Sequence, residues 1–382
     1  MPRKAAERRA RWRSLISAVE RVDVVCMRAS RILGNTLPAG PATRTLELQN
    51  DTYRLHYNTH RSHVKSLTNR DTSDRGRWGR ARSCYAPMAC LLVPGSRAMR
   101  PLTIVWSTDI HLDHLDPGAV HEYAARVVVA QPDALLLGGD ISHATRLRDD
   151  LDRLAELVPL PIHFVLGNHD YYGGSVDAVR ASVADLTGPP LGWLPVSGPV
   201  RLDDGLALVG HGGWGDTRNG DFARAPILSD YLAIEDLVGA AGRANVMAGL
   251  TDRDALRRRL DELGRDAART LEPSLREAAA GSRHVIVLTH VPPFPEAAWH
   301  EGRPSTPPWQ PGFSCRAIGD LLREVATAFP DRRFTVLCGH THGEGHVEMA
   351  PNLEVFTAAA DYGTARINLV RWDGEIPRIQ FG

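Results

Sequence analysis

Five short blocks of polar residues, spread between residues 109 and 342, combine the residue types that bind metal ions and transfer protons. They are Asp109-Ile110-His111, Gly138-Gly139-Asp140, Gly167-Asn168-His169-Asp170, Thr289-His290 and Gly339-His340-Thr341-His342. Carboxylate, amide oxygen and neutral imidazole are ligands that divalent transition metals accept. Two such metals about 3.5–4 Å apart can clamp a phosphoryl group and generate a hydroxide nucleophile. The blocks therefore contain the ligand types that a site of this kind needs.

A hydrophobic run precedes each block. The runs cover residues 103–106, 134–137, 162–166, 284–288 and 334–337. They are short and rich in β-branched residues, which is typical of buried strands rather than helices. In open α/β sheets, functional residues gather just beyond the carboxyl ends of the strands. We therefore expect the five blocks to meet at one place and to form an active site.

Taken singly, these residues have ordinary explanations. An isolated Asp at a strand end is usually a helix cap or a turn residue, and an isolated His is more often a surface or core residue than a ligand. Gly138, Gly139, Gly167 and Gly339 could mark sharp turns that need a positive φ. These explanations do not account for all five blocks in one order, so we favour the site.

The order of the blocks resembles the calcineurin-like metallophosphoesterase superfamily. Its pattern runs D-x-H, GD, GNH followed by an acid, an isolated His and GHxH, and the most specific parts here are GNHD (167–170) and GHTH (339–342). The resemblance implies an α/β fold, a four-layer α/β/β/α sandwich. It also implies a metal-dependent phosphoric ester hydrolase.

The resemblance further implies a role for each polar residue. Seven would be metal ligands: Asp109, His111 and His342 for the first metal, Asn168, His290 and His340 for the second, and Asp140 as the bridge. His169 would face the substrate and stabilise or protonate the leaving-group oxygen, while a metal-bridging hydroxide attacks phosphorus in line. The two divalent metal ions would be Mn, Fe or Zn, because mixed oxygen and nitrogen ligation suits all three.

Small differences within the blocks indicate the branch of the superfamily. The first block reads Asp-Ile-His-Leu, the third ends in Asp, and the GDYVDRG motif of protein phosphatases is missing. These variants are similar to the small bacterial phosphodiesterases and pyrophosphatases. We therefore expect a small phosphate ester substrate, a phosphodiester or phosphoanhydride linked to a nucleotide or lipid. A phosphomonoesterase or protein phosphatase, and a non-catalytic scaffold of the same fold, are the alternatives.

One departure from the family concerns the partner of His169. Relatives of the phosphoprotein phosphatase type read GDxxD, and the second Asp orients the catalytic His. Here His143 stands at that position. Either Asp170 or a backbone carbonyl takes over the orientation of His169, or His143 itself contacts the substrate.

Two loops are candidates for specificity. After the predicted strand 206–209, His211 could line the pocket and Arg218 could hold a phosphate oxygen in its bidentate fork, or both are ordinary loop residues. The loop 291–312 holds seven prolines together with Trp299 and Trp309, and it leaves His290 directly. We expect it to form a rim whose tryptophans either contact substrate or pin the loop to the domain.

A rival interpretation rests on three glycines in the first of these loops. Gly210, Gly212 and Gly215 spell G-x-G-x-x-G after a predicted strand, which is the dinucleotide-binding fingerprint. That motif requires the last glycine to open a helix, whereas Asn219-Gly220 indicates a turn. We therefore reject an oxidoreductase.

The segments between the blocks show helical periodicity. One apolar stripe follows Asp116-Pro117, an N-cap and first-turn pair, and two others begin at Val176 and Ile318. Residues 229–280 are mostly helical in pattern, and this segment is long enough for a cap-like insertion near the site. Arg257-Arg258-Arg259 in this insertion is expected on a solvated face. Residues 353–357, 366–371 and 377–381 read as further strands that close a second sheet against the first.

Charge divides the chain near Met99. Residues 1–98 contain 17 Arg and 2 Lys against 7 acidic residues, a net charge of +12, and the rest of the chain carries −12. We expect residues 1–98 to be a leader that is disordered or comes from an upstream start codon, and residues 99–382 to form the metallophosphoesterase domain. A transit peptide, or a basic arm for nucleic acid or anionic lipid, remains open, although no specific nucleic-acid binding is predicted.

Targeting signals are weak. No uninterrupted apolar segment reaches 18 residues, so no membrane span is predicted. The start of the chain has no hydrophobic region of the kind that secretory signals contain. Only Cys315 and Cys338 lie in the predicted domain, so no disulfide framework is implied. We therefore expect a cytoplasmic protein.

Overall fold

The hydrophobic runs before the five blocks all form strands in the computed structural model, which describes residues 101–242 and 252–382. They are β1 (Leu102–Ser107), β2 (Ala134–Gly138), β3 (Ile162–Val165), β8 (His284–Leu288) and β11 (Arg333–Cys338). Every residue of β2, β3 and β8 is buried. Continuous burial is expected for parallel strands whose sheet is covered on both faces.

The strands build two sheets. The first has the order β15-β14-β1-β2-β3-β5-β4, and the second has the order β12-β13-β11-β8-β7-β6. The remaining strands are β4 (Thr187–Gly188), β5 (Leu191–Trp193), β6 (Val200–Asp203), β7 (Leu206–Gly210), β12 (Gly345–Ala350), β13 (Leu353–Thr357), β14 (Asn368–Trp372) and β15 (Arg378–Gln380). β1, β2, β3 and β5 run parallel, as do β7, β8, β11 and β13. Each sheet therefore presents several carboxyl ends at one edge.

The prediction that three late segments close the second sheet is right for one of them and wrong for two. β13 joins β11 in the second sheet, but β14 pairs antiparallel with β1 in the first sheet, and β15 follows it. Val370 and Trp372 of β14 are buried between the sheets. Without β14, the buried strand β1 would be an edge with unpaired backbone groups, which is unfavourable.

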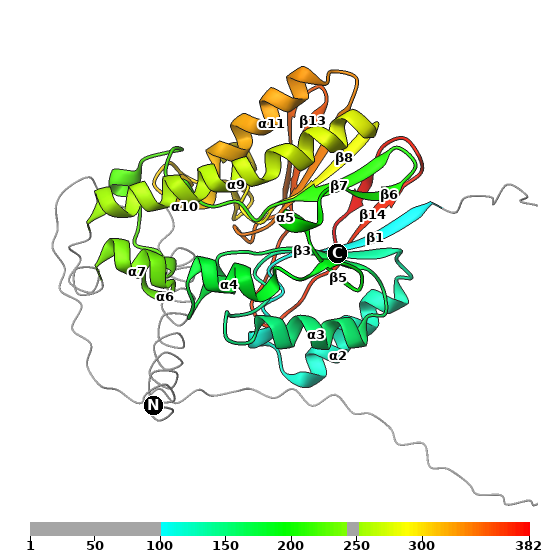
Figure 1. The fold of residues 1–382 in the computed structure, drawn as a ribbon, viewed down its shortest axis with the longest axis horizontal. Helices are drawn as coiled ribbons and strands as arrows, with labels where there is room; N and C mark the ends of the chain where they lie inside the picture. Colours follow the sequence, from blue (N-terminus) through cyan, green and yellow to red (C-terminus); the bar gives the residue numbers. More distant parts are fainter. Residues whose placement is uncertain (1–100, 243–251) are drawn as a thin grey trace, which may run out of the picture. The chain divides into compact units, whose positions relative to one another are not determined.

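Alternation along the strands creates three separate cores. On β1, Ile104 and Trp106 lie between the two sheets, while Val105 faces helices on the outer side of the first sheet. On β8, Ile286 lies between the sheets and Val287 faces helices outside the second. Because successive strand side chains point to opposite faces, each sheet packs on two sides. The predicted α/β/β/α sandwich is confirmed (Figure 1).

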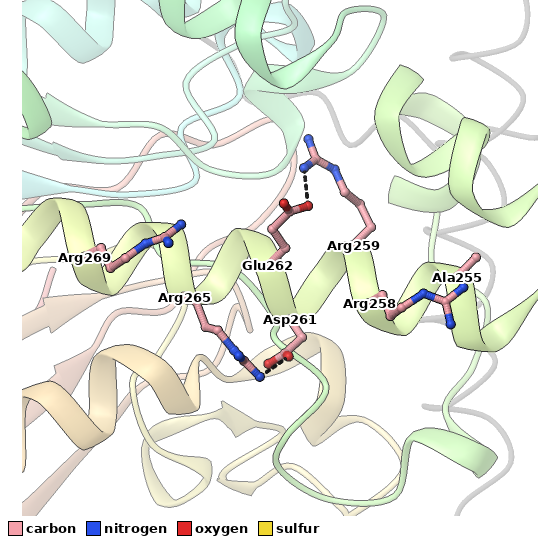
Figure 2. A pocket seen from close by; sticks show the side chains of 7 residues that line it. All are labelled: Ala255, Arg258, Arg259, Asp261, Glu262, Arg265 and Arg269. Atoms are coloured by element: carbon pink, nitrogen blue, oxygen red, sulfur yellow. Dashed lines mark hydrogen bonds and ion pairs between the residues drawn. The ribbon is translucent and has the colours of Figure 1, made fainter.

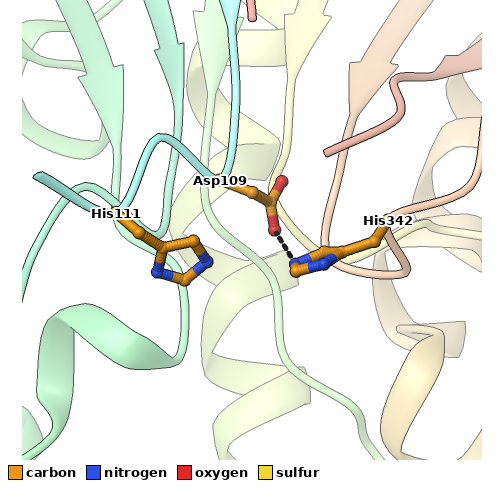
Figure 3. A group of neighbouring side chains, drawn as sticks. All are labelled: Asp109, His111 and His342. Atoms are coloured by element: carbon orange, nitrogen blue, oxygen red, sulfur yellow. Dashed lines mark ion pairs between the residues drawn. The ribbon is translucent and has the colours of Figure 1, made fainter. Parts of the chain in front are cut away.

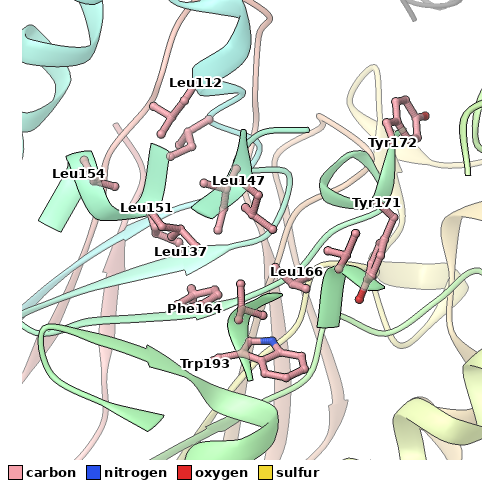
Figure 4. Close-up of a cluster of buried hydrophobic side chains, with 14 of the residues drawn as sticks. Leu112, Leu137, Leu147, Leu151, Leu154, Phe164, Leu166, Tyr171, Tyr172 and Trp193 are labelled. Atoms are coloured by element: carbon pink, nitrogen blue, oxygen red, sulfur yellow. The ribbon is translucent and has the colours of Figure 1, made fainter. Parts of the chain in front are cut away.

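Helices cover the outer faces of both sheets. α2 (Pro117–Val129), α3 (Leu147–Leu157) and α4 (Val176–Val183) contribute to the core on the first sheet, and α9 (Arg253–Gly281) and α11 (Arg316–Ala328) to the core on the second. The Asp116 carboxylate accepts a hydrogen bond from the Ala119 amide at 2.9 Å, so it caps α2 as predicted. Figure 4 shows how Leu147, Leu151 and Leu154 of α3 gather in the first core.

Shorter elements form the loops around the sheet edges. They are the helices α5 (Leu194–Ser197), α6 (Asp230–Ala233), α7 (Glu235–Ala241) and α10 (Gln310–Phe313), the 3-10 turns η1 (Leu112–His114), η2 (His169–Tyr171), η3 (Phe222–Arg224) and η4 (Pro295–Ala297), and the two-stranded hairpin β9 (Trp299–His300) and β10 (Arg303–Pro304). α6, α7 and most of α9 lie within the predicted insertion, 229–280, of which residues 243–251 lie outside the described part.

The arginine run of the insertion is only partly solvated. Arg257 and Arg258 are exposed, as predicted. Arg259 is partly buried, and its guanidinium donates to Asp236 at 2.7 Å and to Glu262 at 2.8 Å. Figure 2 shows the bond to Glu262. The bond to Asp236 joins α9 to α7 within the insertion.

The predicted leader, residues 1–98, lies outside the described residues. Among the helices of residues 101–242 and 252–382, none combines the length and the apolar composition needed to cross a bilayer. Cys315 and Cys338 are both buried with free thiols.

Candidate metal centre

The structure brings all seven predicted ligands together at the carboxyl ends of the strands. Asp109 and His111 follow β1, Asp140 follows β2, Asn168 follows β3, His290 follows β8, and His340 and His342 follow β11. Ligand atoms lie within 4.8 Å of one another in each of three groups: Asp109 with His111 and His342, His111 with Asp140 and His169, and Asp140 with His290 and His340. Asn168 joins the third group, since its Oδ1 lies 3.0 Å from Nε2 of His290. The clustering is what the sequence pattern predicts.

Five of these seven residues have left-handed backbone conformations. Their φ angles are 53° for Asp109, 40° for His111, 49° for Asp140, 70° for His340 and 58° for His342. For residues other than glycine, this region costs of order 1–3 kcal/mol each and persists only where the surroundings impose it. Here neighbouring loops impose it through backbone hydrogen bonds from Asp109 to Gly139 and from His111 to Asp140, both at 3.0 Å. Backbone strain is therefore concentrated where the ligands lie.

Most glycines of the blocks are needed because another group packs against their backbone, and not because of a turn conformation. Of the four glycines that could mark positive-φ turns, only Gly139 has one, at 89°. A Cβ on Gly167 would overlap the Asp140 carboxylate, and one on Gly339 would overlap the Asp109 carboxylate. These positions need glycine because a ligand from a neighbouring strand passes against the backbone.

In the half of the site assigned to the second metal, backbone carbonyls orient both imidazoles. Nδ1 of His290 donates to the Gly138 carbonyl at 2.9 Å, and Nε2 of His340 donates to the Gly312 carbonyl at 3.0 Å. The opposite ring nitrogens, Nε2 of His290 and Nδ1 of His340, then face each other at 3.2 Å. In neutral rings both of these atoms are acceptors.

Asn168 adds a third acceptor to the same point. Its Nδ2 donates to Oδ1 of Asp230 at 2.9 Å, so its Oδ1 is turned towards His290. Oδ1 of Asp140 lies 3.3 Å from Nε2 of the same ring. Acceptors this close repel one another unless a cation, either a proton or a metal ion, lies between them. The donor set therefore fits a divalent metal.

Charge at this point supports the same conclusion. Burial disfavours the charged form of His290, but the carboxylates of Asp140 and Asp109 outweigh it and raise the pKa of this histidine to about 9. Burial would likewise raise the pKa of Asp140, yet His290 and His169 hold it well below its usual range. Without metal, a proton on His290 thus supplies the positive charge that the carboxylates require.

The half assigned to the first metal is less tightly bonded (Figure 3). Nε2 of His342 lies 3.3 Å from Oδ1 of Asp109, whose Oδ2 accepts a hydrogen bond from the Thr108 hydroxyl at 2.5 Å. His111 is 1% exposed, and neither of its ring nitrogens has a hydrogen-bond partner within residues 101–242 and 252–382. Burial lowers the pKa of His111 well below its usual value, so the ring is neutral, as metal binding requires. A buried imidazole without hydrogen-bond partners is rare in proteins, and such a ring fits the role of a metal ligand.

His169 lies beside the ligands. Its ring stacks on Tyr172 at 4.2 Å between centroids and meets the His111 ring edge-on at 4.7 Å. Nδ1 is buried and finds no hydrogen-bond partner in the described part of the chain. Burial lowers the pKa of His169 to about 4.

Asp170 does not orient His169. Its Oδ1 accepts hydrogen bonds from the amides of Ile141 and Ser142, and its Oδ2 accepts one from Gly167, all at 2.8 Å. This carboxylate therefore ties the loop after β2 to the loop after β3. No backbone carbonyl of the described residues bonds to Nδ1 of His169 either. The remaining alternative is a contact of His143 with substrate, and the His143 ring lies nearly parallel to the His169 ring, with 6.3 Å between centroids.

The structure does not join His211 or Arg218 to the ligands. Nδ1 of His211 accepts a hydrogen bond from Gly213, and the guanidinium of Arg218 pairs with Asp216 at 3.1 Å and with Asp261 at 3.2 Å. Both carboxylates hold the arginine against α9, which favours an ordinary structural role. A phosphate contact by Arg218 or His211 stays a prediction.

The proline-rich loop, 291–312, does reach the centre. Its last residue, Gly312, supplies the carbonyl that orients His340, and the Phe313 ring packs edge-on against the same imidazole at 5.4 Å. Trp299 lies against Gly345, where a Cβ would overlap the indole. This tryptophan therefore pins the loop, as one of the two alternatives proposed.

Four residues near the centre were not predicted from the sequence, namely Asp113, His114, Asp230 and Tyr362. Tyr362 places its ring 4.6 Å from His111 and 5.2 Å from His342. Asp113 lies with its Oδ2 3.4 Å from Nε2 of His114 and 3.2 Å from Nε2 of His143, and Asp230 bonds to Asn168 as described above. Asp113 and His114 follow the first block directly, which was an available signal. Nothing in the sequence marks Tyr362 or Asp230.

The chain is similar to a known protein family and to several solved structures. A family model described as calcineurin-like phosphoesterase matches residues 102–344, whereas a search of curated proteins found no match. Among solved structures, a dimetal phosphatase from Danio rerio is 13% identical, with a TM-score of 0.45, and the match covers 74% of this chain and 99% of that one.

Two further structures are similar to a comparable degree. Phosphopantetheinyl hydrolase from Mycobacterium tuberculosis is 13% identical with a TM-score of 0.45, over 69% of this chain and 90% of that one. A protein of Thermus thermophilus is 15% identical with a TM-score of 0.43, over 74% of this chain and 99% of that one. On the match of the family model to most of its length, the chain belongs to the calcineurin-like phosphoesterase family.

Proposed function

We propose that this protein is a two-metal phosphoesterase that hydrolyses a phosphodiester or phosphoanhydride. One observation carries the proposal: three acceptor atoms lie together beside a carboxylate that is close to both halves of the site. Nε2 of His290 is 3.0 Å from Oδ1 of Asn168 and 3.2 Å from Nδ1 of His340. Asp140 is that carboxylate, with its oxygens 3.3 Å from His290 and 3.9 Å from His111.

The ligands divide as the family pattern implies. Asp109, His111 and His342 would hold the first metal, Asn168, His290 and His340 the second, and Asp140 would bridge. Bound metals would polarise the phosphoryl oxygens and make a bound water acidic enough to attack near neutral pH. The mixed oxygen and nitrogen set suits Mn, Fe or Zn.

His169 is the group proposed to act on the leaving-group oxygen. With a pKa of about 4, its ring is neutral near pH 7 and can donate one hydrogen bond. A phosphate anion beside the ring favours the protonated form and shifts this balance towards an acid. His143, close to His169, is the proposed second contact for the substrate.

The substrate class rests on the sequence of the blocks. The Asp-Ile-His-Leu and GNHD forms support a small phosphodiester or phosphoanhydride, linked to a nucleotide or a lipid. The absence of GDYVDRG argues against a protein phosphatase. The cytoplasm is the proposed location, since a reducing compartment suits the two free thiols.

The test compares two chromogenic esters. The full chain is loaded with manganese, and initial rates are measured on bis-p-nitrophenyl phosphate and on p-nitrophenyl phosphate, with a chelated sample as control. We expect metal-dependent hydrolysis with a preference for the diester. A preference for the monoester would move the protein to the phosphomonoesterase alternative. Two bound metals without hydrolysis of either ester would indicate a scaffold.

A further inference from the structure

A buried carboxylate from the insertion reaches into the metal centre. Asp230 opens α6 and is 7% exposed. Its Oδ1 accepts two hydrogen bonds, from Nδ2 of Asn168 at 2.9 Å and from the Tyr172 hydroxyl at 2.7 Å. Asn168 and Asp230 are 62 positions apart in the chain, so this contact exists only because the insertion folds back onto the loop after β3.

The contact decides which way the Asn168 amide points. A carboxamide presents an acceptor oxygen on one side and an NH2 donor on the other, and the two exchange when the group rotates by half a turn. Oδ1 of Asp230 acts as an acceptor, since it also takes the hydrogen bond of the Tyr172 hydroxyl, so it attracts the NH2 group of Asn168. The oxygen is thereby turned to His290, 3.0 Å away. The rotated amide would offer a metal its donor side, which cannot act as a ligand.

The insertion is docked by other bonds as well. The amide of Gly173 donates to the Ala233 carbonyl at 2.9 Å, that of Glu235 to the Gly174 carbonyl at 3.0 Å, and that of Val176 to Oδ2 of Asp236 at 2.7 Å. These bonds do not involve Asp230. Docking and amide orientation can therefore be disturbed separately.

We propose that Asp230 is a positioning residue of the second metal site, through which the insertion supplies the outer support of Asn168. The inference rests on the proposed two-metal function and adds a determinant that no motif marks. Outer partners of this kind typically change metal affinity about 10- to 100-fold when they are removed. Asp230 is expected to act on the second site and to leave the first unchanged.

The experiment measures metal binding in the full chain, independently of turnover. Metal-free protein is titrated with Mn²⁺ by calorimetry, and bound ions are counted by elemental analysis, for the wild type, Asp230→Ala and Asp230→Asn. We expect the alanine variant to lose about 10- to 100-fold in affinity at one of two sites. The asparagine variant should stay close to the wild type, because its amide oxygen can accept both hydrogen bonds.

Two controls separate positioning from general destabilisation. Asp236→Ala removes a docking carboxylate of the same insertion that does not contact Asn168, and it should leave both affinities near those of the wild type. In the background of Asn168→Ala, the Asp230→Ala change should cost nothing further, because residues that act through one another are not additive. Folding of each variant is checked by circular dichroism.

Three results would overturn the inference: equal Mn²⁺ affinities for Asp230→Ala and the wild type, a loss for Asp236→Ala as large as that for Asp230→Ala, or additive losses in the double variant. Failure of the proposed function looks different, because a wild type that binds no pair of metals would refute the centre itself.

Discussion

The two halves of the candidate centre use similar ligands but support them differently. In the second half, the His290 and His340 rings each donate their other nitrogen to a backbone carbonyl, and Asn168 donates to Asp230. In the first half, Asp109 is held by the Thr108 hydroxyl and the His340 backbone amide, but the buried His111 ring has no hydrogen-bond partner among the residues that the structure describes.

This difference has a physical consequence for metal binding. A ligand whose orientation is already fixed loses less entropy when the metal arrives, so preorganised sites bind more tightly. We therefore expect the second half to fill first as metal is added, and the first half to release its metal first. The predictions below test this order.

The largest effect is expected from Asp140, because it belongs to both halves. Asp140→Asn keeps the size of the side chain but removes the charge that both sites share. Removal of an outer partner already costs about 10- to 100-fold, so loss of this ligand should lower hydrolysis by more than about 100-fold. Initial rates on bis-p-nitrophenyl phosphate and metal counts check the prediction, and near-normal turnover would refute the assignment.

Controls for Asp140→Asn come from two other positions. Asp150 is also a buried carboxylate, but it bonds to the Ser142 hydroxyl at 2.5 Å and to Arg146 at 3.0 Å, away from the ligands. Asp150→Asn should retain both metals. Asn168→Ala should weaken the binding of one metal and abolish hydrolysis while the fold stays intact.

A smaller effect is expected from pH. The pKa of His290 in the metal-free protein is raised to about 9, above its ordinary value, so a metal must displace a proton from this ring at neutral pH. Apparent affinity at the second site should therefore rise about tenfold per pH unit as pH increases towards that pKa, and then level off.

The first half should respond to pH through His342, because the Asp109 carboxylate outweighs burial and raises the pKa of this histidine, whereas burial keeps His111 neutral. Calorimetric titrations in buffers of different ionisation enthalpy count the protons released at each site. If no proton is released when the tighter site fills, His290 is not a ligand of that site.

The smallest effect is expected at Tyr362, whose ring lies against His111 and His342 in the first half. Aromatic contacts contribute about 0.5–1.5 kcal/mol each. Tyr362→Ala should therefore weaken the first site roughly 2- to 10-fold, while Tyr362→Phe keeps the ring and the affinity. An equal loss at both sites in Mn²⁺ titrations would contradict a role confined to the first half.

The ligand blocks were predictable because each is local. A buried strand followed by a short polar block can be recognised within about ten residues, and strand alternation then settles which side chains form the core. The family pattern adds the partition of the ligands between two metals. The five strands before the blocks (β1, β2, β3, β8 and β11), the strand β7, the cap of α2 and the clustering of the seven ligands all follow from such local signals.

Other features could not be predicted from local sequence. The sequence of β14 is typical of a strand, but the sheet that it joins depends on which sheet has an unpaired edge strand beside it, and here that strand is β1. Asp170 looks like a partner for its neighbour His169, yet its carboxylate binds the backbone of two loops. Arg218 looks like a phosphate ligand, but two carboxylates engage it. In each case at least one competing partner is remote in sequence: β1 for β14, Ile141 for Asp170 and Asp261 for Arg218.

The sequence by itself determined the strands, the ligand types and the family, because those depend on residue identity and short-range spacing. Only the tertiary structure decided how each ligand is held: His340 by the carbonyl of Gly312, Asn168 by Asp230, and His111 by no hydrogen bond from residues 101–242 or 252–382. Such support comes from atoms that distant segments bring within hydrogen-bonding distance. Hydrogen bonds act over about 3 Å, so those between distant segments depend on the packed fold and produce no recognisable pattern in the sequence.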